Sequence, residues 1–308
     1  MDIDIVIPWV DGSDPRHAEK RNQYIQQEAE DGSRLQRGEL TNSLRWDDFN
    51  ELNLALWSVE KHAPWIRKIW IVTDEQKPDL SQLSVPLQEK IGVVDHKVIF
   101  SGYEDCLPTF NSASIEAMVW RIPGIAEHAI LFNDDIFFLK DTGPEYFFRE
   151  GKLVFRGAFN GGLLEPGLMW SFHRLNGALL AGFPQYKMLT LGHICQPIRV
   201  SVLADFFAKN EPVLRNSVQH KIRHRKQFLL TSLMAHLALK QEMAEVNSKK
   251  DWHYVPASLC ERGSPEQIAQ SFMKFQTDGI QVGNVNNMRS ACEKIPFAYD
   301  FIKEMVSG

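Results

Sequence analysis

The sequence of 308 residues is poor in cysteine and has no long apolar run. Its four cysteines are scattered without a CxxC pair, which argues against a zinc site and makes reduced thiols the expectation. No stretch approaches the roughly 18 consecutive apolar residues of a membrane span. The acidic start, from Met1 to Asp4, lacks the basic and apolar parts of a secretion signal. These absences favour a cytoplasmic location.

The chain also lacks two common nucleotide-binding motifs. Neither GxGxxG nor GxxxxGK followed by Ser or Thr occurs, so the usual signatures of dinucleotide oxidoreductases and ATPases are missing. The net charge of −5 gives no argument for nucleic acid as a partner. A composition of 44% hydrophobic and 24% charged residues is ordinary for a globular protein.

In the first half of the chain, apolar runs alternate with amphipathic stretches, and this order predicts an α/β fold. We expect a mostly parallel, Rossmann-like sheet with flanking helices, and ligands beyond the carboxyl ends of its strands. The expected strands are residues 3–10, 68–73, 93–100 and 129–132, and the expected helices are 16–30, 48–62 and 112–119.

The pattern changes beyond residue 150. Residues 151–192 are rich in glycine and aromatics, and helices are expected over 198–210 and 226–244. No repeat or low-complexity linker separates the two halves. We therefore predict one unit over residues 1–308 with a helical insertion, in which residues 1–150 bind the ligand and residues 151–308 complete the site.

The run Asn133-Asp134-Asp135 lies between an expected buried strand and another apolar stretch. Burying a carboxylate is costly unless it is paired or bound to a cation. The run therefore indicates a divalent metal or acid–base chemistry. Taken alone, it is more typical of a surface turn, because Asn and Asp favour turns.

Polar residues follow other expected strands. Trp9 and Asp11 precede the turn residues Gly12-Ser13-Asp14-Pro15, where Trp9 is suited to stack on a base or sugar. The alternative is a turn with a core tryptophan. Arg45, ahead of the helix that Asp48 is placed to cap, is a candidate for phosphate binding.

Two further segments suit binding or proton transfer. Asn111 precedes an expected helix and can cap it or bind a sugar. His193 follows Gly192 in an expected loop, and its near-neutral ordinary pKa suits proton transfer, although a lone histidine is more often structural.

Residues 215–226 concentrate basic side chains in a slightly acidic protein. Arg223 and Arg225 are candidates for a diphosphate clamp, because guanidinium groups bind phosphates with paired hydrogen bonds. The alternative is a solvated basic face.

These pieces, in this order, resemble the Stealth family of sugar-1-phosphate transferases. The first conserved block resembles the residues from Ile3 to Pro15, and the second resembles Arg45-Trp46-Asp47-Asp48 through Phe132-Asn133-Asp134-Asp135. The third is similar to the segment from His193 to His224. The fourth resembles Val285-Asn286-Asn287, with Asn where Asp is usual.

The resemblance implies a glycosyltransferase A-like fold and a particular reaction in capsular or extracellular polysaccharide synthesis. An acceptor sugar hydroxyl attacks the phosphate next to the sugar of a UDP-N-acetylhexosamine. Sugar 1-phosphate is transferred as a phosphodiester and UMP leaves. The partners implied are the nucleotide sugar and an oligo- or polysaccharide acceptor, with association at the inner face of a bacterial membrane.

The resemblance also implies roles for the candidate residues. Asp134 and Asp135 are expected to bind Mg²⁺ or Mn²⁺, or one of them acts as the base. His193 and Arg223 match active-site residues of the family, and Trp9, Asp11, Arg45, Asp48, Asn111 and Arg225 are expected to bind substrate. The alternatives are a conventional UDP-sugar glycosyltransferase and a non-catalytic carbohydrate-binding relative.

Overall fold

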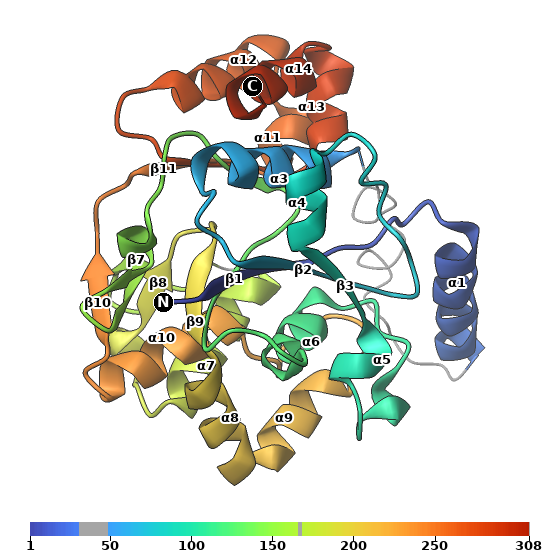
Figure 1. The fold of residues 1–308 in the computed structure, drawn as a ribbon. Coiled ribbons are helices and arrows are strands. Elements are labelled where there is room, and N and C mark those ends of the chain that lie inside the picture. The colour runs from blue at the N-terminus through green and yellow to red at the C-terminus, as the bar shows by residue number, and fades with distance from the viewer. Residues whose placement is uncertain (31–48, 166–167, 308) are drawn as a thin grey trace.

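A computed structural model describes residues 1–30, 49–165 and 168–307. Its main sheet has the strand order β3-β2-β1-β4-β9 (Figure 1). The first four of these strands are mutually parallel and only β9 is antiparallel, which confirms the mostly parallel α/β sheet. The strands are β1 (Ile3–Pro8), β2 (Lys68–Thr73), β3 (Ile91–Asp95), β4 (His128–Leu131) and β9 (Gln196–Arg199).

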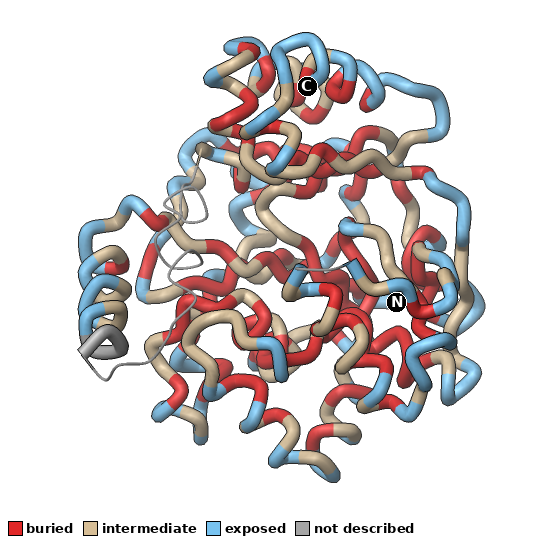
Figure 2. Tube along the Cα trace, turned by 180° about the vertical axis from the view of Figure 1, so that it is seen from behind, coloured by how far each residue is buried: buried red, intermediate tan, exposed pale blue. Residues whose placement is uncertain are grey.

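Helices cover both faces of this sheet. In Figure 1, α3 (Glu51–His62) and α4 (Val85–Lys90) lie on one side, and α5 (His96–Ile99) and α6 (Ser112–Glu116) lie on the other. β1 is therefore buried along most of its length, and its side chains are apolar apart from Asp4. Figure 2 shows the buried residues concentrated along the central strands, whereas α1 (Pro15–Glu30) lies at the periphery.

The second half of the chain builds further sheets and packs helices beside them. One sheet has the order β10-β7-β6, with β8 also paired to β7, and another has the order β11-β12-β5. The strands are β5 (Ile136–Phe138), β6 (Phe148–Arg149), β7 (Lys152–Phe159), β8 (Leu189–Leu191), β10 (Ala244–Asn247), β11 (Trp252–Val255) and β12 (Val282–Val285). The longer helices are α7 (Met169–Leu180), α8 (Val200–Lys209), α9 (Glu211–Val218), α10 (Leu230–Lys240), α11 (Ala257–Arg262), α12 (Pro265–Met273), α13 (Met288–Lys294) and α14 (Ala298–Val306).

Two strand pairings join the second half to the first. β9 pairs with β4 so that Gln196 lies opposite Leu131, and β12 pairs with β5 so that Asn284 lies opposite Ile136. Residues that precede β9 therefore lie beside residues that follow β4. These pairings position the candidate site.

Several expected elements have different bounds: the helix expected over 226–244, for example, is α10, and Ala244 begins β10 instead. The strand expected over 93–100 begins at Ile91 and ends at Asp95, whose side chain accepts a hydrogen bond from the backbone of Lys97 and caps α5. The helix expected over 198–210 begins at Val200, because the two preceding residues belong to β9.

The four cysteines are free, in agreement with the expectation of reduced thiols. Across residues 1–30, 49–165 and 168–307, no helix combines the length and apolar character needed to cross a membrane.

Asp4 is a fully buried carboxylate that ties β1 to its neighbours. It accepts hydrogen bonds from Arg67 Nε (2.8 Å) and Nη2 (2.6 Å), from Trp70 Nε1 (2.8 Å) and from the backbone of Ala126 (2.9 Å). These contacts compensate for burying the charge, and they hold the residues that immediately precede β2 and β4 in place.

We expect Asp4→Ala to lower the free energy of unfolding by about 3 kcal/mol, because several donors would lose a buried acceptor. The matched control is Asp2→Ala, since Asp2 is exposed on the same segment. Urea unfolding followed by circular dichroism measures both changes. Equal stability of the two variants would show that Asp4 does not hold the sheet together.

Candidate functional site

The carboxyl ends of β1, β2 and β4 meet at one edge of the main sheet. Asp11 follows β1, Asp74 follows β2, and Asp134 and Asp135 follow β4 within a few residues. This is the edge at which ligands bind in open α/β sheets. The sequence placed the acidic residues at this edge correctly.

Asp135 is held by the segment that continues β12. Its carboxylate accepts hydrogen bonds from the side-chain amides of Asn284 (3.3 Å) and Asn286 (3.2 Å), one on each oxygen. Its backbone carbonyl accepts a further bond from Val285 (3.1 Å). Asn286, in the segment that resembles the fourth block, therefore places an amide donor against Asp135.

Burial raises the pKa of Asp135 to about 7, even though both amides favour the ionised form. Beside it, the Oδ1 atom of Asn284 is buried and has no hydrogen-bond partner within the described part of the chain. Asp134 is half-buried next to this pair. The site thus combines a carboxylate whose pKa is about 7 with an amide oxygen that has no hydrogen-bond partner among the described residues.

His193 lies beyond β8 at the same edge. A side chain at Gly192 would place a Cβ 2.7 Å from the Trp252 ring, so the close packing of this backbone on Trp252 favours glycine. The imidazole lies against Tyr254, with 4.8 Å between the ring centroids. Although the residue as a whole is exposed, the pKa of His193 is lowered to about 4 by removal of water around the ring and by the nearby cations Arg223 and Arg174.

Tyr254 connects His193 to Asp135. It stands in β11 opposite Asn284 of β12, and its pKa is raised to about 12 by burial and then by the charge of Asp135. The sequence analysis missed this residue. Its strand is short and carries no motif, so only the pairing of β11 with β12 reveals its position.

Arg223 lies at the start of α6, close enough for its charge to act on His193. Its Nη2 donates to the Oγ atom of Ser112 at 2.9 Å. Glu116, four residues further along α6, has a pKa raised to about 7 by burial and partly lowered by the charge of Arg223. The guanidinium therefore lies between the start of α6 and His193.

Asn111 fixes the segment that carries Arg223. Its Oδ1 accepts the backbone N–H of Ala113 and caps α6, and its Nδ2 donates to the carbonyl of His220 (2.8 Å) and to Gln227 (2.9 Å). The side chain is 1% exposed. The structure thus shows a capping and positioning role, and direct contact with a substrate stays a prediction.

The other substrate-binding candidates are placed differently. Arg225 is exposed, and its guanidinium lies over the ring of Phe172 at 3.7 Å from the centroid rather than beside Arg223. The segment is not a strand, and the two guanidinium groups contact different residues, Ser112 and Phe172. Arg45 and Asp48 lie outside the described residues. Binding by these three residues stays a prediction.

Trp9 and Asp11 line a cavity of about 300 Å³ at the ends of β1 and β2, with Asp14, Arg16, Glu75, Gln76 and Lys77. The backbone N–H of Asp11 donates to Gln76 Oε1 (2.8 Å), and Gln76 Nε2 donates back to the carbonyl of Asp11 (2.7 Å). Trp9 is only 7% exposed, so its ring forms a wall of the cavity.

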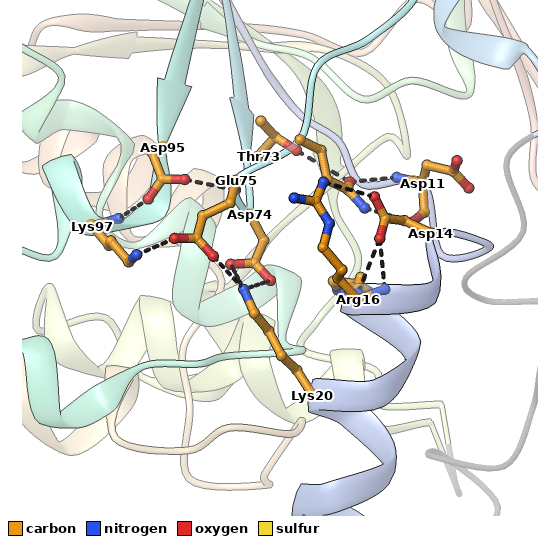
Figure 3. A network of polar contacts seen from close by, with 11 residues as sticks. Asp11, Asp14, Arg16, Lys20, Thr73, Asp74, Glu75, Asp95 and Lys97 are labelled. Carbon is orange, nitrogen blue, oxygen red and sulfur yellow. Dashed lines mark hydrogen bonds and ion pairs between the residues drawn. The ribbon is translucent and has the colours of Figure 1, made fainter.

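Charged side chains hold the loop after β2 in place (Figure 3). Lys20 contacts Asp74 (3.1 Å) and Glu75 (2.7 Å), and Lys97 contacts Glu75 from the other side. The two lysines lower the pKa of Glu75 to about 2. This network stabilises the loop that carries Gln76 into the cavity wall.

No group of three or more His, Cys, Asp or Glu side chains with metal-binding geometry occurs among the residues that the structure describes. A cation near Asp135 would therefore need asparagine oxygens or a bound substrate among its ligands.

Two family models match the chain. The model described as Stealth protein CR1, conserved region 1, matches residues 1–29, and Stealth protein CR2, conserved region 2, matches residues 45–155. The candidate residues Trp9, Asp11, Asn111 and Asp135 lie within these matches.

Curated relatives match part of the chain or most of it. The capsular polysaccharide phosphotransferase of Neisseria meningitidis serogroup B is 31% identical over 241 residues, which are 75% of this chain and 62% of that protein. Capsular polysaccharide phosphotransferase cps1A of Actinobacillus pleuropneumoniae is 41% identical over 48% of this chain and 38% of its own length. Exopolysaccharide phosphotransferase cps2G of Lactiplantibacillus plantarum is 38% identical over 50% of this chain and 41% of its own length. The chain thus matches less than two thirds of the length of each.

Among solved structures, galactosyltransferase LgtC in complex with donor and acceptor sugar analogs matches 98% of this chain and 95% of that chain. The TM-score is 0.48 and the sequence identity is 10%, a likeness on which nothing further is built.

We expect Arg223→Gln to raise the pKa of His193 from about 4 towards its ordinary value of 6.5, because removing a nearby positive charge favours the protonated imidazole. Arg225→Gln is the matched control, since that guanidinium lies on Phe172. NMR titration of the imidazole measures both. A pKa of His193 that is equal in the two variants would contradict the placement of Arg223.

Proposed function

The chain belongs to the Stealth family by its two matched conserved regions, and on this premise we propose that it is a sugar-1-phosphate transferase. Its donor is a UDP-N-acetylhexosamine and its acceptor is a saccharide hydroxyl. The product is a phosphodiester of capsular or extracellular polysaccharide, and UMP leaves. A cytoplasmic reaction at the inner face of a bacterial membrane is part of the same proposal.

One observation carries this proposal. Asp135, His193 and Arg223 come from three separate segments and lie near one another: the charge of Arg223 acts on His193, whose ring lies against Tyr254, and the charge of Asp135 acts on Tyr254. Phosphoryl transfer depends on positioning and charge neutralisation more than on covalent help from the protein. A carboxylate, an imidazole and a guanidinium that lie near one another can provide both positioning and charge neutralisation.

The bond changes are as follows. The acceptor oxygen bonds to the β-phosphorus of the donor, and the bond from that phosphorus to the bridging α–β oxygen breaks. The electron pair leaves with UMP, and the hydroxyl proton passes to a base of the protein. A conventional glycosyltransferase instead breaks the bond at the sugar carbon and releases UDP.

We assign the donor to the edge between β1 and β4. The uridine occupies the cavity beside Trp9 and Asp11, where the indole wall and loop amides supply apolar and polar contacts. Arg223 binds the diphosphate, since a guanidinium forms paired, charge-assisted hydrogen bonds with phosphate oxygens.

The donor atoms around Asp135 fit a hard divalent cation such as Mg²⁺ or Mn²⁺. Asp134 and Asp135 provide carboxylate oxygens, and Asn284 provides the buried amide oxygen that lacks a partner among the described residues. When bound, such a cation neutralises the charge that develops on the phosphate oxygens. A cation would also lower the pKa of Asp135 from about 7 and hold it ionised.

His193 is our candidate for the base. In the free protein its pKa of about 4 makes it a weak base, because Arg223 and Arg174 lie nearby. A bound diphosphate would compensate these two positive charges, so the imidazole would regain basicity when the donor is in place. Donor binding thereby prepares proton transfer from the acceptor.

The leaving nucleotide tests the reaction. We expect UMP in amounts equal to the sugar transferred when the protein is incubated with UDP-N-acetylglucosamine or UDP-N-acetylmannosamine, Mg²⁺ and an oligosaccharide primer. Anion-exchange chromatography separates the nucleotides. Release of UDP would instead identify a conventional glycosyltransferase, and saccharide binding without turnover on any donor would identify a carbohydrate-binding relative.

The metal assignment has its own test. We expect Mg²⁺ to raise the melting temperature of the wild type at pH 8, since a ligand at a hundredfold excess over Kd stabilises by about 2.7 kcal/mol. Asp135→Asn should lose both this shift and turnover. Asp278→Asn is the control, because Asp278 is exposed beside Lys140. An unchanged Mg²⁺ shift in Asp135→Asn would rule Asp135 out as a ligand.

A further inference from the structure

A tryptophan, an arginine and a glutamate form a connected group at the start of α7. The Arg174 guanidinium lies over the ring of Trp170, 3.9 Å from its centroid, and its Nη2 donates to Glu165 Oε1 at 3.1 Å. Trp170 is 39% exposed, and the side chain of Glu165 is 54% exposed. We call these three residues the α7 cluster.

Arg174 is the buried member of the α7 cluster. It is 4% exposed, and its Nε is buried without a hydrogen-bond partner among the described residues. Burying a charged group with an unmade hydrogen bond costs stability. Such an arrangement is typical of a functional position, because a structural arginine normally satisfies its donors.

The α7 cluster borders the candidate site. The charge of Arg174 acts on His193, and the charge of Glu165 acts on Tyr254. His193 immediately precedes β9, the last strand of the main sheet, whereas the Trp9–Asp11 cavity lies at β1 and β2. In the main sheet, β9 and the strands that carry the cavity lie on opposite sides of β4, and the α7 cluster lies near His193, on the β9 side.

This arrangement matters for phosphoryl transfer, in which the attacking and leaving oxygens stand roughly in line on opposite sides of the phosphorus. The proposed function places the leaving UMP at the Trp9–Asp11 cavity. The acceptor hydroxyl must then approach from the opposite side, where the α7 cluster lies.

We propose that Trp170 and Glu165 form the binding subsite for the acceptor saccharide, an inference that rests on the proposed function. One face of the indole is covered by Arg174, and the exposed part of the ring packs against the C–H face of a pyranose. The carboxylate of Glu165 accepts hydrogen bonds from sugar hydroxyls. Arg174 positions both side chains and lies nearest to the reacting phosphate.

The neighbouring surface supports a ligand of some length. Leu163 (70% exposed) and Leu168 (40% exposed) flank Glu165 and Trp170 in the sequence. Exposed apolar side chains that adjoin a site are typical of ligand-binding grooves. A chain of sugar rings presents apolar faces and hydroxyls in alternation, which matches this mixture of side chains.

The test compares acceptor and donor kinetics on the primer that the wild type extends. We expect Trp170→Ala to raise the KM for the primer about tenfold or more, and Trp170→Phe to recover most of that loss because it keeps an aromatic face. Glu165→Gln, which keeps a hydrogen-bond acceptor for Arg174, should raise the same KM, and its melting temperature is measured beside it. Donor KM and the slow release of UMP to water should stay within twofold of wild type.

Phe297→Ala is the matched control, because Phe297 is 56% exposed before α14, away from the site. Unchanged primer KM in both Trp170→Ala and Glu165→Gln would overturn the subsite while leaving the proposed function standing. A parallel rise in donor KM would overturn it too, by placing the cluster on the donor side. Absence of UMP release in the wild type would instead refute the proposed function, and the subsite with it.

Discussion

The contact between Asp135 and Asn286 is the interaction on which the candidate site depends. It joins residues 151 positions apart and exists because β12 pairs with β5 immediately after the acidic run. Without that pairing, the carboxylate would stand at an open turn, hydrated and ionised. With it, burial raises the pKa of Asp135 to about 7 and places Asn284 and Tyr254 beside it. One antiparallel pairing therefore surrounds the carboxylate of the turn with the other residues of the candidate site.

The electrostatics around this centre are balanced for an anionic ligand. Arg223 and Arg174 lower the pKa of His193, and burial raises the pKa values of Asp135 and Glu116. Each shift reflects a charge that lacks full compensation in the free protein. A diphosphate with a divalent cation would compensate both signs at once. The charged groups would then already be in position before the reaction begins.

Much of the fold follows from local patterns, but the site does so only in part. β2 and the acidic strand ends could be predicted, because an apolar run buried on both faces and the polar residues that end it are close in sequence. The partners of Asp135 could not, because Val282–Val285 has no alternation of apolar and polar residues and nothing local specifies which strand it pairs with. Tyr254 and Trp170 carry no motif at all. The short helix after Asp95 was missed because its capping contact competes with an apolar pattern typical of a strand.

The central claim is that the bond broken lies between the two phosphates of the donor. It is tested most directly by a UDP-N-acetylhexosamine carrying ³²P in the phosphate next to the sugar. After incubation with Mg²⁺ and primer, the account predicts that the label moves to the saccharide and resists phosphomonoesterase, as a phosphodiester does. Recovery of the label in UDP, with unlabelled sugar on the primer, would contradict it.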